Sequence, residues 1–414
     1  MTRERSGTVV LSVRLRVVIP VVVVIAAVLG LLVGARLPES SSPAQAGSTG
    51  PGSETTPGAS PSDSDGTGVT TPVATTRNIE NYPITRLKPG EKPPQFVIVS
   101  FDGSCKHELF QHYYDLGQQT NSRFTFFLSG LCLVPDQMRF QYHPPLKPVG
   151  SSAIGFADPT LVNGRVQDWS LAYTSGYEIG THWLGHFCDS RGVAAWTSAN
   201  WQSELDQARR FLDQWAEVNA GNPSANLSLK LSFDSSVWHG DRTPCLAGRR
   251  SQMYPVFAKA GFTYDASNGG SLEWPRHIPG YQMWNFPLQT IKIIDWPGNR
   301  HNLSMDYNLL YVQNNGDVKA APAKCATMQA SAYSSYMAAL KAVYNGNRAP
   351  FFVGNHFEQW ACGAYANALS EFIVNAHQQF PGVEFVSNEY LVKWLAAQTP
   401  AVIAELQATG VQKQ

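Results

Sequence analysis

The sequence predicts an α/β domain with a mainly parallel sheet and helices on its outside. A nearly continuous apolar run at residues 95–101 has the length and composition of a strand that is buried on both faces. Strands and amphipathic helices, often separated by glycine, then alternate to about residue 397. This alternation predicts parallel strands but does not distinguish a closed barrel from an open sheet.

The spacing of apolar residues supports each element. In the helix expected at residues 201–215, apolar side chains recur every three to four positions, and Gly221 lies just past the end. The other elements expected after the first strand are a helix at residues 109–116, a strand at 123–128, a helix at 166–175, a strand at 177–180, a helix at 255–260, a strand at 262–264, a helix at 334–344, a strand at 350–355, a helix at 366–379, a strand at 383–386 and a helix at 389–396.

The N-terminal region lacks the composition of a globular core, since no Phe, Tyr or Trp occurs before Tyr82. Residues 17–35 are uncharged and strongly apolar, and as a helix they would span about 28 Å, close to the bilayer thickness. Arginines precede this run, so residues 1–16 are expected in the cytoplasm and the domain outside it. The alternative is a secreted protein whose signal peptide is cleaved near Ala44-Gln45-Ala46.

Residues 36–87 are rich in Ser, Pro, Gly and Thr and are expected to form a disordered linker. The predicted domain covers residues 88–397, and residues 398–414 are expected to form a C-terminal tail. Lys+Arg and Asp+Glu balance at 31 each, which argues against nucleic-acid binding. The six cysteines predict up to three disulfides in an oxidising compartment, in any of 15 pairings.

Candidate chemical groups lie at the carboxyl ends of predicted strands, where functional residues of parallel α/β folds gather. Asp102 follows the first strand, and His356 ends a late apolar run. His182 and His186 are four residues apart, a spacing that places both imidazoles on one side of a helical turn. Two imidazoles and a carboxylate suit Zn²⁺ or a similar divalent ion, which would activate water and polarise a carbonyl. This set predicts metal-assisted hydrolysis of an amide or ester.

Other residues would assist that reaction. A carboxylate would take the proton of the attacking water, and a histidine opposite would protonate the leaving group. Arg242 could orient a carboxylate through a bidentate pair. Backbone N–H groups near Cys245 could stabilise an oxyanion.

These residues resemble the motifs of polysaccharide deacetylases that have a NodB-like domain. Residues 99–103 (Val-Ser-Phe-Asp-Gly) are similar to the family's first motif, Thr-Phe-Asp-Asp-Gly. Residues 178–186 contain its second motif, His-x-x-x-His, and residues 241–246 are similar to its third, Arg-x-Pro-Tyr. Residues 348–356 end in the histidine of its fifth motif. The resemblance covers most of the folded part and is strongest to actinobacterial members that are membrane-anchored or secreted.

The resemblance implies a distorted (β/α) barrel that removes acetyl groups from a cell-surface or cell-wall polysaccharide, linked through nitrogen or oxygen. Asp102 would be the general base and His356 the general acid. His182 and His186 would bind a divalent metal, with Zn²⁺ expected. The backbone N–H of Cys245, where the family usually has Tyr, would stabilise the oxyanion.

Two further features of the resemblance concern carboxylates. The family's fourth motif, an Asp–Trp pair, has only a loose match at Asp295-Trp296, and Asp306 is an equally suitable supporting carboxylate. Gly103 stands where the family has its metal-binding Asp. Three outcomes remain open at this point. Asp102 is the third metal ligand, another group such as His107 or Glu358 completes the site, or the chain binds cell-wall glycan without metal or catalysis.

Overall fold

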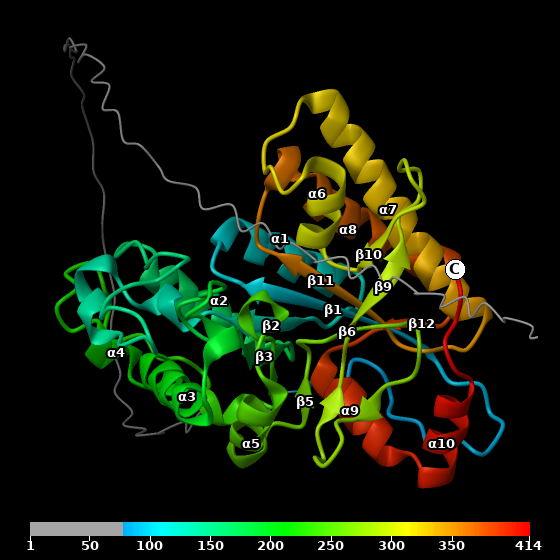
Figure 1. Ribbon diagram of the computed structural model, residues 1–414, viewed down its shortest axis with the longest axis horizontal. Coiled ribbons are helices and arrows are strands. Elements are labelled where there is room, and N and C mark those ends of the chain that lie inside the picture. The colour runs from blue at the N-terminus through cyan, green and yellow to red at the C-terminus, as the bar shows by residue number, and fades with distance from the viewer. Residues whose placement is uncertain (1–77) are drawn as a thin grey trace, which may run out of the picture. The chain divides into compact units, whose positions relative to one another are not determined.

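The computed structural model describes residues 78–414 (Figure 1). The expected cytoplasmic N-terminus at residues 1–16, the membrane span at residues 17–35 and most of the linker at residues 36–87 lie outside the described residues. No helix within residues 78–414 is long and apolar enough to cross a membrane.

The strands within residues 78–414 form two sheets, and the larger one places the parallel strands side by side. The strands are β1 Gln95–Gly103, β2 Thr125–Leu128, β3 Glu178–Thr181, β4 Gly240–Asp241, β5 Tyr264–Asp265, β6 Gly269–Gly270, β7 Arg276–His277, β8 Trp284–Asn285, β9 Leu288–Lys292, β10 His301–Leu303, β11 Phe351–His356 and β12 Val383–Phe385.

The larger sheet has the order β11-β1-β2-β3-β4-β5-β8-β7, with β12 paired to β1 as a branch. All these pairs are parallel except β7 with β8. The smaller sheet, β10-β9-β6, lies next to β11, where Gly354 donates its N–H to the Ser304 carbonyl at 2.9 Å. The predicted α/β class is confirmed, but the described strands form a curled half-barrel whose outer strands, β11 and β7, do not pair with each other.

Helices cover the larger sheet. Seven α-helices form where the sequence predicts a helix, with shifts at the ends, and the helices at residues 215–218, 306–314 and 400–408 were not predicted. The α-helices are α1 His107–Gln119, α2 Val162–Thr174, α3 Ser198–Asp213, α4 Trp215–Val218, α5 Arg250–Ala260, α6 Asp306–Asn314, α7 Pro322–Asn345, α8 Trp360–Gln379, α9 Asn388–Ala397 and α10 Pro400–Ala408. Short 3-10 helices are η1 Gly130–Leu133, η2 Asp136–Gln141, η3 Val193–Ala195, η4 Ser235–Val237 and η5 Pro244–Leu246. Figure 1 shows α7 and α8 packed side by side over β11 and β1.

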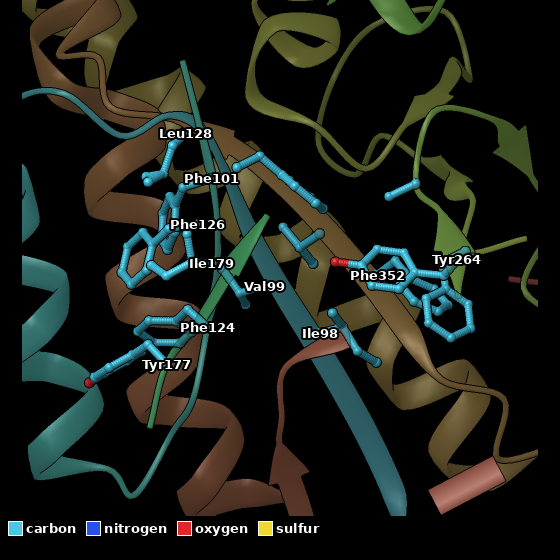
Figure 2. Packing of buried hydrophobic residues seen from close by; sticks show 14 of the residues in the cluster. Ile98, Val99, Phe101, Phe124, Phe126, Leu128, Tyr177, Ile179, Tyr264 and Phe352 are labelled. Carbon is cyan, nitrogen blue, oxygen red and sulfur yellow. The ribbon is translucent and has the colours of Figure 1, made fainter. Parts of the chain in front are cut away.

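The central strand β1 separates two buried layers, because alternate side chains of a strand point to opposite faces. Figure 2 shows Val99 and Phe101 packed with an aromatic cluster on one side of the sheet, while Ile98 points toward Tyr264 and Phe352 on the other. By the same alternation, Ser100 and Asp102 lie on the face of Ile98, toward the inside of the half-barrel. The register of β1 therefore determines that Asp102, the candidate base, lies on the inner face of the sheet.

The domain extends beyond the bounds that the sequence analysis gives it. Residues 398–414, expected as a tail, include α10, whose Val402 and Leu406 are buried against the rest of the chain. Thr399 caps this helix by accepting a hydrogen bond from the Val402 N–H. Within the predicted linker, Ile79 is buried. Two buried apolar residues in a nine-residue helix give a weak periodic signal, so only contacts distant in sequence reveal this packing.

Candidate active site

One cavity of about 810 Å³ lies at the carboxyl ends of β1, β3, β4 and β11. Its wall brings together five candidates that are widely separated in sequence: Asp102, His182, His186, Cys245 and His356. Parallel pairing explains this gathering, since the register sets Asp102 beside His356 and Thr181 beside Asp241.

Asp102 and Arg242 form a buried ion pair, with 2.9 Å between Oδ1 and Nη1. The guanidinium also donates from Nη2 to Ser100 Oγ at 2.8 Å and from Nε to the Ala266 carbonyl at 3.1 Å. The bidentate fork expected from the sequence is therefore not formed, because the other nitrogens have different partners. Burial by itself raises the pKa of Asp102, but the charge of Arg242, together with that of His356, outweighs burial and holds the pKa below its ordinary value. Asp102 is therefore ionised at neutral pH.

His182 is fixed in one tautomer. Its Nδ1 donates to the Arg242 carbonyl at 2.8 Å, which leaves the Nε2 lone pair free for a ligand. Burial lowers the pKa of His182 to about 4 and also lowers that of His186, so both rings are neutral near pH 7. The ring centroids are 5.1 Å apart. The helical turn expected here is absent: residues 182–187 form a loop in which Trp183 and His186 have positive φ angles of 62° and 53°.

A buried hydrogen-bond network holds that histidine loop from behind. The Gly185 N–H donates to Tyr142 Oη at 3.1 Å and to Glu204 Oε1 at 3.3 Å, and Tyr142 Oη donates to Glu204 at 2.8 Å. Trp183 Nε1 donates to Asp241 Oδ2 at 2.9 Å. The loop therefore owes its shape to side chains of other segments rather than to helical hydrogen bonds.

The donor set fits a divalent metal only in part. Among residues 78–414, the only group of three ligand-type side chains whose ligand atoms all lie within 4.8 Å of one another is His186, Cys188 and Cys245. Cys188 and Cys245 form a disulfide and so provide no thiolate. No carboxylate in residues 78–414 forms such a group with His182 and His186. The two imidazoles thus offer two nitrogen ligands, and no described residue forms a compact group of three with them. Asp102 lines the same cavity and its charge acts on both rings, but its carboxylate is paired with Arg242.

The two alternative third ligands have other partners. His107 Nδ1 contacts the Asp168 carboxylate at 2.9 Å, and His107 is not among the residues that line the cavity. Glu358 does line the cavity but pairs with Lys106. Gly103 also lines it and has a φ angle of +84°, and a Cβ at this position would meet no atom within 4 Å. The cavity therefore has room for a side chain at position 103.

Asp306 supports His356 through two hydrogen bonds. Its Oδ1 lies 2.8 Å from His356 Nδ1, and its Oδ2 accepts the His356 backbone N–H at 2.7 Å. Burial alone lowers the pKa of His356, but the adjacent Asp306 carboxylate outweighs burial and raises it above its ordinary value. Asp295 has a different position: it lies in an exposed turn after β9, with a φ of 52°, and does not line the cavity.

Two of the three disulfides fix parts of the cavity wall, because Cys105, Cys132, Cys188 and Cys245 line it. The pairs are Cys105–Cys132, Cys188–Cys245 and Cys325–Cys362, so none of the six cysteines is free. Cys188–Cys245 ties the histidine loop to η5, where Cys245 and Leu246 have positive φ angles of 61° and 52°. Such a backbone conformation is unfavourable for side-chain-bearing residues and persists only where surrounding contacts enforce it. The disulfide is one such contact.

An aromatic wall beside His356 was not expected from the sequence. Trp360 lies 5.0 Å from the His356 ring and 5.7 Å from Tyr307, measured between centroids, and both aromatic residues line the cavity. Tyr307 directly follows Asp306, and Trp360 lies four residues after His356. These short spacings from the candidate residues could have indicated the two aromatic side chains in the sequence. Only the packing of α6 against β11 brings the rings together.

No family model matches the chain, and no curated protein matches it. Among solved structures, a protein named as a polysaccharide deacetylase from Mycobacterium smegmatis is 14% identical, with a TM-score of 0.42 and coverage of 77% of this chain and 97% of that one. The Xyl-CE4 domain of a xylanase from the hindgut metagenome of Trinervitermes trinervoides is 12% identical, with a TM-score of 0.38 and coverage of 73% and 92%.

A mutant of a CE4 family pseudoenzyme with restored enzymatic activity is 11% identical, with a TM-score of 0.36 and coverage of 76% and 73%. The chain is thus similar to proteins of the deacetylase family that its motifs resemble. At these identities and TM-scores, the similarity does not assign chemistry to the cavity.

Proposed function

We propose that this chain is a hydrolase that removes acetyl groups from a polysaccharide outside the cytoplasm. The observation that carries the proposal is that one cavity contains a carboxylate with a lowered pKa and a histidine with a raised pKa. Asp102 is held ionised by Arg242, and His356 is held protonated to higher pH by Asp306. An ionised carboxylate and a protonated imidazole are the base and the acid that acyl transfer to water requires.

In this proposal, Asp102 takes the proton of a water that attacks the acetyl carbonyl. The backbone N–H of Cys245 donates to the oxygen that becomes negative, and His356 gives its proton to the departing nitrogen or oxygen of the sugar. Trp360 and Tyr307 offer flat faces on which a sugar ring can stack. A divalent ion such as Zn²⁺, when held by His182 and His186, would add positive charge near the acetyl oxygen.

The location outside the cytoplasm is part of the proposal. Three disulfides support an oxidising compartment. Anchoring through residues 17–35 remains a prediction from the sequence, as does the alternative of a secreted protein.

The test is release of acetate from N-acetylated and O-acetylated oligosaccharides by the purified chain, with added Zn²⁺ and with a chelator. D102N and H356N are each expected to lower the rate by roughly 10²-fold or more, since each removes a proton-transfer group. D295N is the matched control, because that carboxylate is exposed and outside the cavity. Acetate release that persists unchanged in D102N and H356N would exclude this mechanism.

A second candidate function is glycan binding without catalysis. It is favoured by Gly103, which carries no carboxylate, and by the absence among the described residues of a compact three-ligand group that includes both histidines. This alternative predicts glycan affinity that depends on Trp360 and no acetate release under any metal condition. Calorimetric binding and acetate release, measured on the same preparation, separate the two candidates.

A further inference from the structure

We propose that Arg165 binds a carboxylate carried by the glycan, so that the cavity selects acidic over neutral acetylated sugars. This inference deepens the proposed function, because it concerns the ligand of the same cavity. Arg165 lies in the first turns of α2 and lines the cavity wall on the side of β1 and β2.

The charges that line the cavity are paired, with one exception among the described residues. Asp102 pairs with Arg242, and Lys106 pairs with Glu358. Arg165 has no carboxylate within ion-pair distance anywhere in residues 78–414. The cavity wall therefore carries one guanidinium that has no direct ion-pair partner among the described residues.

Arg165 is also held in place. Its Nε donates to the Cys105 carbonyl at 3.1 Å and its Nη1 donates to the Cys132 carbonyl at 2.6 Å. A disulfide joins these two cysteines, so both acceptors belong to one cross-linked segment of the wall. Nη2 makes no hydrogen bond to any described residue and remains available to a ligand. A guanidinium fixed in this way loses little conformational freedom on binding, which favours affinity.

The partial burial of Arg165 also supports binding of a ligand carboxylate. Removal from water lowers the pKa of Arg165, and the charges of Asp158 and Asp168 offset this only from a distance. A positive charge that is partly removed from water and lacks a partner is costly, and a ligand carboxylate would compensate it. Arginine matches the planar geometry of a carboxylate better than lysine does.

The carboxylate could belong to a uronic acid ring or to a lactyl ether on an amino sugar. The experiment measures calorimetric affinity of the full chain for three N-acetylated tetrasaccharides. One is neutral chitotetraose, one alternates N-acetylglucosamine with glucuronic acid, and one alternates N-acetylglucosamine with N-acetylmuramic acid. Carboxyl-reduced forms of the two acidic ligands keep their shape without the charge. The arm with the tighter binding identifies the source of the carboxylate.

At least one acidic ligand should bind roughly tenfold more tightly than its carboxyl-reduced form, as a charge-assisted hydrogen bond would provide. R165Q should remove this preference while changing the affinity for chitotetraose by less than about twofold. R165K should keep part of the preference, because the charge remains. R300Q, which removes an exposed arginine outside the cavity, should behave as the wild type.

Two results would overturn the proposal. One is equal affinity for acidic and carboxyl-reduced ligands. The other is an equal loss of affinity for all ligands in R165Q, which would mean that Arg165 only maintains the structure of the cavity wall. Acetate release is measured in parallel. A preference for the charged ligands without acetate release would support the role of Arg165 and contradict the proposed hydrolase. Acetate release without such a preference would support the hydrolase and contradict the role of Arg165.

Discussion

Asp306 accepts both the Nδ1 proton and the backbone N–H of His356, at 2.8 and 2.7 Å, although the two residues are 50 positions apart. The carboxylate is almost completely buried. It therefore fixes the imidazole orientation and stabilises its protonated form. Three predictions about pH follow from this pair and from the pair formed by Asp102 and Arg242.

Asp306→Asn should move the alkaline limit of activity to lower pH. Asp306 raises the pKa of His356, so loss of its charge makes the imidazole lose its proton earlier as the pH rises. At pH 8 the variant should lose about tenfold or more in kcat/KM, and less at pH 6. The measurement is the pH profile of kcat/KM. D295N should leave the profile unchanged, and a D306N profile that falls equally at every pH would contradict a role through His356.

The same pair affects stability with a defined sign. The folded-state pKa of His356 is raised, so its contribution to stability is present below the ordinary pKa of 6.5 and is lost as the pH rises through the folded-state pKa. The difference in unfolding free energy between wild type and D306N should therefore be larger at pH 5.5 than at pH 9.

Arg242→Met should destabilise the fold by about 3–5 kcal/mol at pH 8, because Asp102 is left buried and charged without a partner. In the wild type the pKa of Asp102 is depressed, so its stabilising contribution is present above the ordinary value and is lost as the pH falls through the folded-state pKa. In the variant, burial favours the neutral acid. The difference in unfolding free energy between the wild type and R242M should therefore be smaller at pH 5 than at pH 8. Urea unfolding at both pH values measures this.

A double mutant tests the attribution to Asp102. D102N/R242M should recover much of the stability that R242M loses at pH 8, since no charge remains to be buried. A double mutant as unstable as R242M would mean that the loss comes from the contacts of Arg242 with Ser100 and Ala266 instead.

Gly103→Asp should increase zinc affinity by at least about tenfold, because it adds an oxygen ligand beside two neutral imidazoles. The added Cβ meets no atom within 4 Å, although the φ of +84° costs roughly 1 kcal/mol for a residue other than glycine. Calorimetric zinc titration measures the affinity, and zinc should also raise the melting temperature of G103D more than that of the wild type.

Gly261 provides a matched control for that variant, since its φ is +86°, its Cβ position is equally open and it lies outside the cavity. G261D should leave zinc affinity unchanged, and H182A in the G103D background should abolish the gain. Equal affinity in the wild type and G103D would mean that another group already completes the site.

Glu204→Gln should remove a loss of stability with rising pH. Burial raises the pKa of Glu204 to about 7, so its contribution is favourable below the ordinary pKa of 4.5 and is lost as the pH rises toward 7. Between pH 5 and pH 8, the wild type should lose about 2 kcal/mol more than E204Q, as measured by urea unfolding. The exposed Glu217 is the control, and E217Q should follow the wild type.

Several features of the fold were predictable because they depend on local patterns. The apolar run of β1 and the helical stripe of α3 are properties of contiguous residues, and both elements form where the sequence places them. By contrast, β4 has two residues and α10 buries two apolar side chains, so neither has a distinct period. Their formation depends on partners elsewhere in the chain.

The sequence by itself determined the α/β class and the set of groups with the chemistry for hydrolysis, because strand periodicity and residue type are both local. Only the tertiary structure decided how those groups combine. His356 pairs with Asp306 rather than with Asp295, and Arg242 pairs with Asp102 through one nitrogen. The tertiary structure also decided which of the 15 possible sets of cysteine pairs forms. It also decided that no carboxylate among the described residues forms a compact three-ligand group with His182 and His186. Each of these depends on sheet register and loop packing between distant segments, and the spacing of residues along the chain does not specify either one.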